Sequence, residues 1–193
     1  MQLPNAITLS RLGVAVLSFV MLELAGRPEA DSRLAIDAPL MWAAFGLFLV
    51  AAITDFVDGW LARRWKQVTP LGRVLDPFAD KVLTCGAMIL LLKFPEARKI
   101  MPDWVVVIVV AREFLVTAVR GVVEAAGRPF PADRLGKWKM VSQCWTAAAL
   151  LTLDAGTDVF GWAAVAGLWI SLVLTVVSGA NYVWKARDVL FAR

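Results

Sequence analysis

The sequence of 193 residues contains no histidine, only two cysteines and a single tyrosine. The lack of histidine excludes a Ser-His-Asp triad, zinc sites built on histidine, and an imidazole acting as general acid or base. Cys85 and Cys144 both lie in apolar stretches, which is typical of small packing residues and not of a disulfide or metal pair. A general base in this chain is therefore expected to be a carboxylate, with lysine or tyrosine as the less favoured choices.

Charged residues are also scarce, at 19% of the chain, whereas hydrophobic residues reach 60%. Soluble domains are nearer half apolar, so the composition predicts a membrane protein, and the length fits one domain over residues 1–193. Several apolar segments reach the ~20 residues that cross a bilayer. We predict an all-α integral membrane protein with six transmembrane helices, preceded by a short N-terminal amphipathic helix over residues 2–10. The six segments are residues 11–25, 39–62, 75–93, 102–126, 135–153 and 159–185.

The few charges also predict an orientation. Lysine and arginine are more frequent in the loops on the side of the N-terminus than in those on the opposite side. Basic residues accumulate in cytoplasmic loops, so both termini are expected in the cytoplasm. The net charge of +4 suits contact with anionic membrane lipids. Because the basic residues are divided among short loops, nucleic acid is not an expected partner.

Four aspartates lie where one apolar segment ends and the next begins, namely Asp55, Asp58, Asp76 and Asp80. Carboxylates at a membrane boundary are costly and usually mark an ion or substrate site. The first two are three residues apart and the last two are four apart, so on helices each pair shares one face. Two helices joined by a short loop could direct both pairs to one point, where cations would relieve their repulsion. Hard oxygen ligands suit Mg²⁺ or Mn²⁺, while solvated helix ends are the alternative interpretation.

The spacing of these aspartates forms a specific motif, D-x-x-D-G-x-x-A-R-x8-G-x3-D-x3-D. Its positions are filled by Asp55, Asp58, Gly59, Ala62, Arg63, Gly72, Asp76 and Asp80. With every position present, segment 55–80 resembles the signature of the CDP-alcohol phosphatidyltransferase family. The pattern of apolar segments resembles that family across nearly the whole chain.

The resemblance implies a role for each residue of the motif. Asp55, Asp58 and Asp76 would be ligands of two Mg²⁺ or Mn²⁺ ions. Asp80 would contact the second ion and act as the general base towards the acceptor hydroxyl, which attacks the CDP-alcohol so that CMP leaves.

The resemblance also implies a nucleotide site. Arg63 would meet the CDP phosphates, and Asn5, Thr8 and Arg11 resemble the N-terminal stretch of bacterial members of the family. Helix capping by Asn5 or Thr8 is an equal alternative, and the glycines could instead serve helix packing. The expected CDP contacts are Asn5, Thr8, Asp58, Gly59, Ala62, Arg63 and Gly72.

A second group of charges suggests the acceptor. Arg112 and Glu113 interrupt an apolar segment near its middle, where a buried arginine requires an anion. That anion is either Glu113 or a substrate phosphate. Together with Arg120, Lys137 and Lys139, Arg112 would form a basic pocket for a small phosphorylated alcohol.

The segments AREFLVTAVRG and GKWKMVSQ resemble the branch of the family whose acceptor is sn-glycerol 3-phosphate. The resemblance implies transfer of the phosphatidyl group from CDP-diacylglycerol, giving phosphatidylglycerophosphate and CMP, at the cytoplasmic side of a bacterial inner membrane. Phosphatidylglycerol (for CMP-forming cardiolipin synthesis) and inositol phosphate stay open as alternative acceptors. A cation transporter is the non-enzyme alternative, but it would not need Gly59, Ala62 and Arg63 at the motif spacing. Family members are often dimers, so a homodimer is a further expectation.

Overall fold

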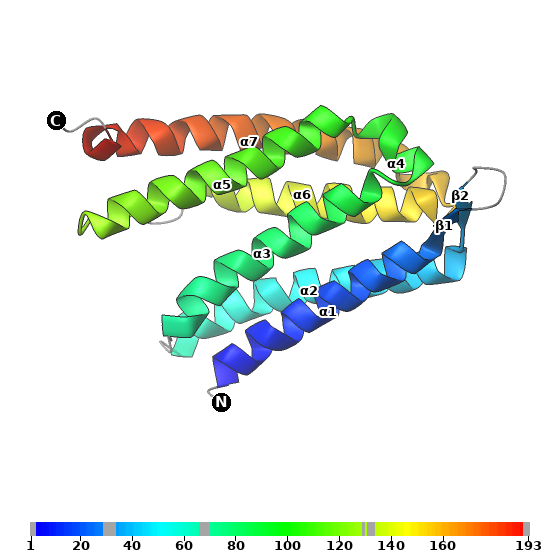
Figure 1. The fold of residues 1–193 in the computed structure, drawn as a ribbon, viewed down its shortest axis with the longest axis horizontal. Coiled ribbons are helices and arrows are strands. Elements are labelled where there is room, and N and C mark those ends of the chain that lie inside the picture. Colours follow the sequence, from blue (N-terminus) through cyan, green and yellow to red (C-terminus); the bar gives the residue numbers. More distant parts are fainter. Residues whose placement is uncertain (1–2, 29–33, 66–69, 129, 131–133, 191–193) are drawn as a thin grey trace.

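The structure is a computed structural model that describes residues 3–28, 34–65, 70–128, 130 and 134–190. Within these ranges, only the backbone is described for residues 3–5, 27–28, 34–35, 56–65, 70–71, 73–74 and 134. The chain is almost entirely helical, and its termini lie at the end of the molecule away from a small β-hairpin (Figure 1).

In the described part of the chain, six long helices correspond to the six apolar segments expected from the sequence. They are α1 (Leu3–Ala25), α2 (Ala38–Trp65), α3 (Pro70–Leu91), α5 (Asp103–Ala125), α6 (Arg134–Asp154) and α7 (Gly161–Leu190). Short elements join them: β1 (Gly26–Pro28), β2 (Leu34–Ile36), α4 (Pro95–Ile100) and the 3₁₀ turn η1 (Asp158–Phe160). The strands pair antiparallel, with Gly26 opposite Ile36. The hairpin and α4 were not expected from the sequence.

Helix α1 differs from its prediction. The expected amphipathic helix over residues 2–10 is not a separate element, because α1 continues from Leu3 to Ala25. Of the polar residues that suggested an interfacial helix, Ser10 is exposed, whereas Thr8 is buried in the protein, as is Arg11 just beyond it. Their partners lie on α2 and α3, so the first turns of α1 belong to the helix bundle.

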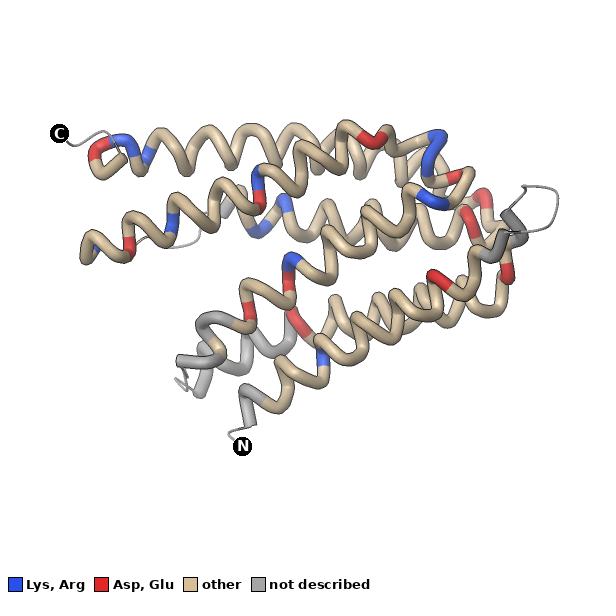
Figure 2. Tube along the Cα trace, in the orientation of Figure 1, with Lys and Arg blue, Asp and Glu red and all other residues tan. Residues whose placement is uncertain are grey.

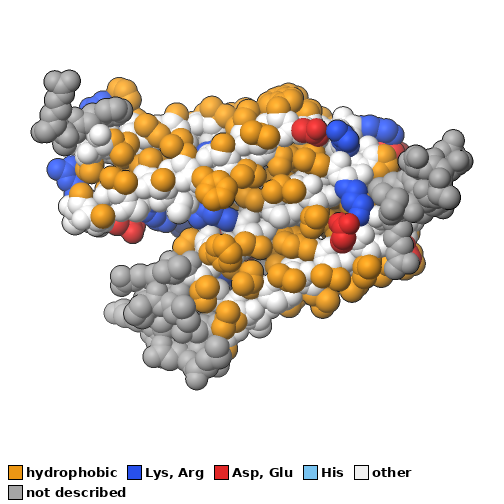
Figure 3. All heavy atoms as spheres, viewed as in Figure 1, with side chains coloured by type: hydrophobic (Ala, Val, Ile, Leu, Met, Phe, Trp, Pro, Cys, Tyr) orange, Lys and Arg blue, Asp and Glu red, His pale blue; other side chains and the backbone are white. Residues whose placement is uncertain are grey.

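Three stretches of the described residues are long and apolar enough to cross a membrane, Ala6–Ala25, Ala38–Asp55 and Asp158–Leu190. Hydrophobic side chains cover much of the visible face of the molecule (Figure 3). Large apolar side chains such as Phe114 and Trp162 are among the exposed ones. An apolar exterior of this kind suits a lipid environment, in agreement with an all-α membrane protein.

The helices form two groups that set up the site. Helix α1 packs along α2 and α3, while α7 packs along α5 and α6 (Figure 1). Helix α3 also touches α5 and α6, and so joins the two groups. Gly86 of α3 allows the approach of α1, because a Cβ atom there would lie 2.6 Å from the ring of Phe19. The fully buried side chains Phe48, Leu83 and Met88 come from α2 and α3 and belong to the core.

Asp154, at the end of α6, forms hydrogen bonds to α4. Its two carboxylate oxygens accept hydrogen bonds from the backbone N–H groups of Glu96 (3.0 Å) and Ala97 (2.9 Å) in the first turn of α4. These N–H groups have no partner within their own helix, so the buried carboxylate satisfies them.

Asp154→Ala should therefore destabilise the protein by about 1–3 kcal/mol, since it leaves buried N–H groups without acceptors. Thermal unfolding in detergent measures this effect as a lower midpoint. Asp158→Ala is the matched control, because Asp158 is exposed and its loss should stay within about 0.5 kcal/mol. Equal midpoints for the two variants would show that the contact with α4 contributes nothing.

Candidate active site

The structure brings three of the four motif aspartates to one place. Asp55 lies towards the end of α2, and Asp76 and Asp80 lie on successive turns of α3. Most other charges lie near helix ends, whereas this group lies where α1, α2 and α3 meet (Figure 2). Asp58 also belongs to α2, but its side chain lies outside the described residues.

An arginine from α1 lies at the centre of this acidic group. The Arg11 side chain is only 4% exposed, and one of its terminal nitrogens contacts Asp55 and lies 3.4 Å from Oδ1 of Asp80. Its other terminal nitrogen lies 3.8 Å from Oδ1 of Asp76, which also accepts a 2.7 Å hydrogen bond from the Thr8 hydroxyl. We refer to Arg11, Asp55, Asp76 and Asp80 as the aspartate cluster.

Sequence reasoning did not assign this central place to Arg11. The signal available in the sequence was its position, since Thr8 and Arg11 are three residues apart and share a helix face. The packing of α1 on α2 and α3 decides which helices contact that face.

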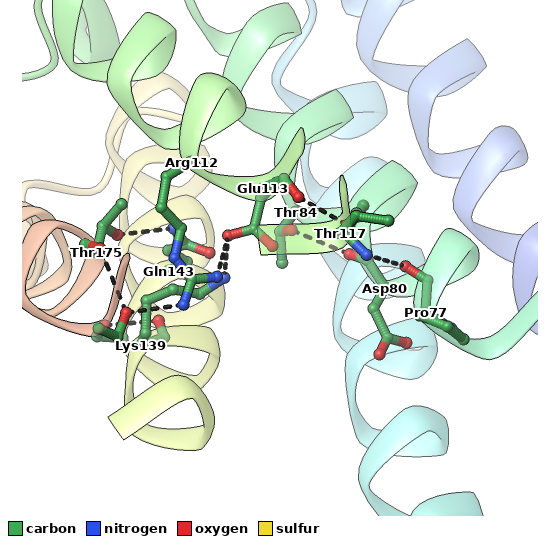
Figure 4. Close-up of polar contacts among 12 residues, drawn as sticks. Pro77, Asp80, Thr84, Arg112, Glu113, Thr117, Lys139, Gln143 and Thr175 are labelled. Atoms are coloured by element: carbon green, nitrogen blue, oxygen red, sulfur yellow. Dashed lines mark hydrogen bonds and ion pairs between the residues drawn. The ribbon is translucent and has the colours of Figure 1, made fainter. Parts of the chain in front are cut away.

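The local structure of α3 explains how two aspartates reach the same site. Asp76 and Asp80 are four residues apart, so they project from one face of the helix. Pro77 lies between them, and its carbonyl accepts a 3.0 Å hydrogen bond from Nζ of Lys81 (Figure 4). The Lys81 ammonium is thereby held one turn back on α3. One turn further on, the Thr84 hydroxyl donates to the Asp80 carbonyl at 2.9 Å.

The carboxylate oxygens of the cluster are donor atoms of the type that a hard divalent cation binds. Three carboxylates against one guanidinium leave an excess of two negative charges. Among the described residues, Oδ1 of Asp80 is buried and has no hydrogen-bond partner. Carboxylate oxygens are the ligands preferred by Mg²⁺ and Mn²⁺. However, no three acidic, cysteine or histidine side chains of the described part are close enough to share one ion.

Several predicted nucleotide contacts fall in the part of α1 and α2 for which only the backbone is described. These are Asn5 on α1 and Asp58, Gly59, Ala62 and Arg63 on α2, whose side chains lie outside the described residues. Gly72 is described and is buried near the start of α3, one turn before Asp76. Thr8 is described as well, and it contacts the aspartate cluster.

A second buried group joins α5, α6 and α7. Arg112 donates to Oε1 of Glu113 at 3.0 Å and to the hydroxyl of Ser178 at 2.8 Å. Nζ of Lys139, from α6, donates to the same Glu113 oxygen (Figure 4). The three charged side chains are each less than 10% exposed. We refer to Arg112, Glu113 and Lys139 as the basic cluster, because two cations surround one carboxylate.

Unused hydrogen-bonding capacity remains around the basic cluster. Within the described part of the chain, Nε of Arg112 and Oε1 of Gln143 are buried without a partner. The amide nitrogen of Gln143 donates to the Thr175 hydroxyl at 3.2 Å. The guanidinium of Arg112 also lies 5.7 Å from the ring centre of Tyr182. The cluster therefore has an excess positive charge and polar atoms that an additional ligand could satisfy.

Of the other two predicted acceptor residues, one has other partners and one lies at the surface. Arg120 donates to the backbone carbonyl of Phe130 at 3.1 and 3.3 Å and lies 3.4 Å from Glu124. Lys137 is exposed at the start of α6. Of the four predicted phosphate contacts, Arg112 and Lys139 are thus brought together, through Glu113.

Comparison with known proteins decides the family. Residues 1–177 match the sequence model of the CDP-alcohol phosphatidyltransferases. The chain belongs to the CDP-alcohol phosphatidyltransferase family. It is therefore a transferase, and the acidic motif on α2 and α3 lies within the matched region.

Several bacterial relatives resemble this phosphatidyltransferase over nearly its whole length. A Bacillus subtilis protein is 38% identical over 195 residues, covering 98% of this chain and 97% of the relative. A Rickettsia bellii protein is 33% identical, covering 94% and 93%. A Cereibacter sphaeroides protein is 29% identical, covering 98% and 97%. Each of the three is named CDP-diacylglycerol–glycerol-3-phosphate 3-phosphatidyltransferase.

In this phosphatidyltransferase the two clusters lie on neighbouring helices. Asp80 is carried by α3, which touches both α5 and α6, the helices that carry the basic cluster (Figure 4). An acidic group suited to cations thus lies beside a basic group suited to an anion. A reaction between a metal-bound diphosphate and a phosphorylated alcohol needs both kinds of site.

Proposed function

We propose that this enzyme transfers the phosphatidyl group of CDP-diacylglycerol to sn-glycerol 3-phosphate, forming phosphatidylglycerophosphate and CMP. The observation that carries the proposal is that two buried cations, Arg112 and Lys139, meet at the carboxylate of Glu113 beside the aspartate cluster. Full-length similarity to relatives named for this reaction supports the same acceptor. Inositol phosphate would also suit a basic pocket, but none of these three relatives is named for it.

The aspartate cluster would bind the diphosphate end of CDP-diacylglycerol. Asp55, Asp58, Asp76 and Asp80 would hold two divalent cations, Mg²⁺ or Mn²⁺. Such ions neutralise a diphosphate and stabilise the charge that passes to the leaving CMP. Asn5, Thr8, Gly59, Ala62, Arg63 and Gly72 would complete the CDP site.

Asp80 would act as the general base. Its carboxylate would take the proton from the attacking hydroxyl of glycerol 3-phosphate. The hydroxyl oxygen would form a bond to the phosphorus that carries the diacylglycerol. The bond from that phosphorus to the CMP oxygen would break, and CMP would leave with the electron pair. A side-chain exposure of 32% leaves Asp80 accessible to substrate.

The basic cluster would bind the phosphate of the acceptor. Arg112 can meet a phosphate with two parallel hydrogen bonds, and Lys139 adds a second positive charge. Arg112 and Lys139 both donate hydrogen bonds to Glu113 in this structure, so the phosphate would have to share these donors with Glu113 or replace it. Arg120 and Lys137, closer to the cytoplasmic ends of their helices, would assist arrival of the anion.

The membrane arrangement is part of the same proposal. All six long helices would cross a bacterial inner membrane, with both termini and the aspartate cluster on the cytoplasmic side. The basic loops on that side support this orientation. CDP-diacylglycerol would then enter from the lipid phase and glycerol 3-phosphate from the cytoplasm. Association into a homodimer is also proposed.

A panel of acceptors tests the proposed function. The purified enzyme would receive CDP-diacylglycerol and Mg²⁺ or Mn²⁺ with glycerol 3-phosphate, phosphatidylglycerol, inositol phosphate or glycerol. We expect phosphatidylglycerophosphate to form at least about tenfold faster than any other lipid product, with one CMP released for each. Faster formation of another lipid would assign another acceptor, and CMP release without any metal would contradict the metal site.

Arg112→Lys should selectively impair use of glycerol 3-phosphate. A lysine cannot reproduce the two parallel hydrogen bonds of arginine, and a lost charged hydrogen bond costs roughly 1.5–3 kcal/mol. We therefore expect kcat/KM for glycerol 3-phosphate to fall about tenfold or more, measured by steady-state kinetics. The KM for CDP-diacylglycerol should change much less.

The Arg112→Lys prediction has a control variant and a result that would contradict it. Arg187→Lys is the matched control, because Arg187 is half exposed and its guanidinium lies 4.3 Å from the ring centre of Trp184. Equal loss towards both substrates in Arg112→Lys would instead show that the Arg112–Glu113 pair serves folding alone.

A further inference from the structure

We propose that Arg11 is the counter-ion of the aspartate cluster in the metal-free enzyme, and that divalent cations must compete with it for the carboxylates. The inference rests on the metal site of the proposed function. It assigns to Arg11 a positioning role, because it would act through the aspartates and not on the substrate.

The contacts of Arg11 tie three helices together. The guanidinium starts from α1 and reaches Asp55 on α2 and both Asp76 and Asp80 on α3. A guanidinium is planar and carries several N–H donors, so it can serve carboxylates that arrive from different directions. The aspartates therefore surround the guanidinium instead of closing around one shared point.

Burial makes the charge of Arg11 important. Its side chain is 4% exposed, so its charge is poorly screened by water and acts strongly on the neighbouring carboxylates. Lys81 also lies close in sequence, but its ammonium donates to the Pro77 carbonyl. Among the described residues, Arg11 is thus the cation in contact with all three carboxylates.

The cluster is also incompletely satisfied as it stands. Within the described residues, Nε of Arg11 is buried without a hydrogen-bond partner, and buried Oδ1 of Asp80 has only the ion pair with Arg11 at 3.4 Å and no hydrogen bond. The excess of negative charge would attract further cations, yet the guanidinium already occupies an oxygen of Asp55. Binding of a divalent ion would thus be favoured by the remaining negative charge and opposed by repulsion from the Arg11 guanidinium.

Two opposite consequences follow for a neutral replacement. Without the guanidinium, the carboxylates repel one another, so the metal-free protein should be less stable. The same change frees carboxylate oxygens and removes a positive charge, so a divalent ion should bind more tightly. A residue needed only for packing would lower stability without tightening metal binding.

The experiment measures Mn²⁺ binding to the full-length protein in detergent, without substrates. Free Mn²⁺ is followed by electron paramagnetic resonance, and thermal unfolding is followed with a chelator and with saturating Mn²⁺. For Arg11→Gln we expect the Kd for Mn²⁺ to fall at least about tenfold. Its unfolding midpoint should be lower than that of the natural protein in chelator and should rise more on addition of Mn²⁺.

Two further variants separate contact from general charge. Lys81→Gln removes a positive charge one residue from Asp80 that does not pair with the cluster, so its Kd should change less than about threefold. Arg11→Lys keeps the positive charge but offers a single ammonium nitrogen in place of the two terminal nitrogens of the guanidinium. It should bind Mn²⁺ more tightly than the natural protein and less tightly than Arg11→Gln. If Arg11→Gln fails to fold, Arg11→Lys replaces it as the test variant.

Each result decides the matter. An unchanged or weaker Kd in Arg11→Gln, or in Arg11→Lys if only that variant folds, would overturn the proposal. An equal increase in Mn²⁺ affinity in Lys81→Gln would also overturn it. Loss of any nearby positive charge would then explain the effect, whether or not that charge contacts the aspartates. If the natural protein binds no Mn²⁺ at all, the metal site of the proposed function fails, which is a distinct outcome from failure of the competition.

Discussion

Asp80→Asn is expected to lower turnover by about 10²–10⁴-fold, the range that general-base catalysis contributes. An amide keeps the size of the side chain but cannot accept the proton of the acceptor hydroxyl. Asp80 is well placed for this role, since it lies in the aspartate cluster on the helix that faces the basic cluster. Single-turnover release of CMP measures the effect on chemistry.

Binding of CDP-diacylglycerol separates the two possible roles of Asp80. Excess Mn²⁺ should restore lipid-nucleotide binding to Asp80→Asn but not its rate. Asp103→Asn is a suitable control, because Asp103 is exposed at the start of α5 and pairs with Arg98 at 3.2 Å. If metal alone recovers the full rate, Asp80 is a metal ligand and another group is the base.

Asp55→Asn and Asp76→Asn are each expected to lower kcat by about 10²–10³-fold, the usual cost of losing one charge-stabilising group. Each change removes a carboxylate from a cluster in which three of them surround Arg11. The metal concentration needed for half-maximal rate should rise as well. The measurement is the rate of CMP release over a titration with Mg²⁺ or Mn²⁺.

The two aspartate variants also test the proposal of two ions. Near-normal turnover of either variant at saturating metal would rule out a two-metal site that includes that residue. A large loss in Asp55→Asn with a small one in Asp76→Asn would place the ion nearer α2. Thr8, which donates to Asp76 at 2.7 Å, offers a milder change: Thr8→Val removes that hydrogen bond without removing a charge.

The helices could be predicted because their signal is local. Long apolar stretches of about the length that crosses a bilayer leave few alternatives, since backbone groups in lipid must be satisfied within the helix. The segments expected at 39–62 and 102–126 correspond to α2 and α5 with small differences at the ends. The first segment was placed too late, because Thr8 looks like a surface residue until its partner Asp76 on α3 is known.

The aspartate pairs could also be predicted, for the same local reason. A spacing of four residues places Asp76 and Asp80 on one helix face whatever the rest of the chain does. The convergence of α2 and α3 was a reasonable expectation from the short connection between them. The side chains of Asp58 and Arg63, on which the same prediction depends, lie outside the described residues.

The partners of the buried charges were decided by tertiary structure. Arg11 is separated from Asp55, Asp76 and Asp80 by more than forty residues, and no local pattern states which helix faces will meet. Lys139 and Ser178 reach the Arg112–Glu113 pair in the same way, from α6 and α7. The sequence by itself determined six long helices, a carboxylate motif and an isolated charged pair within an apolar segment. Only the packing of α1 on α2 and α3 decided that a guanidinium lies among the aspartates, because a charge without water must find its partner in whatever surface the fold places beside it.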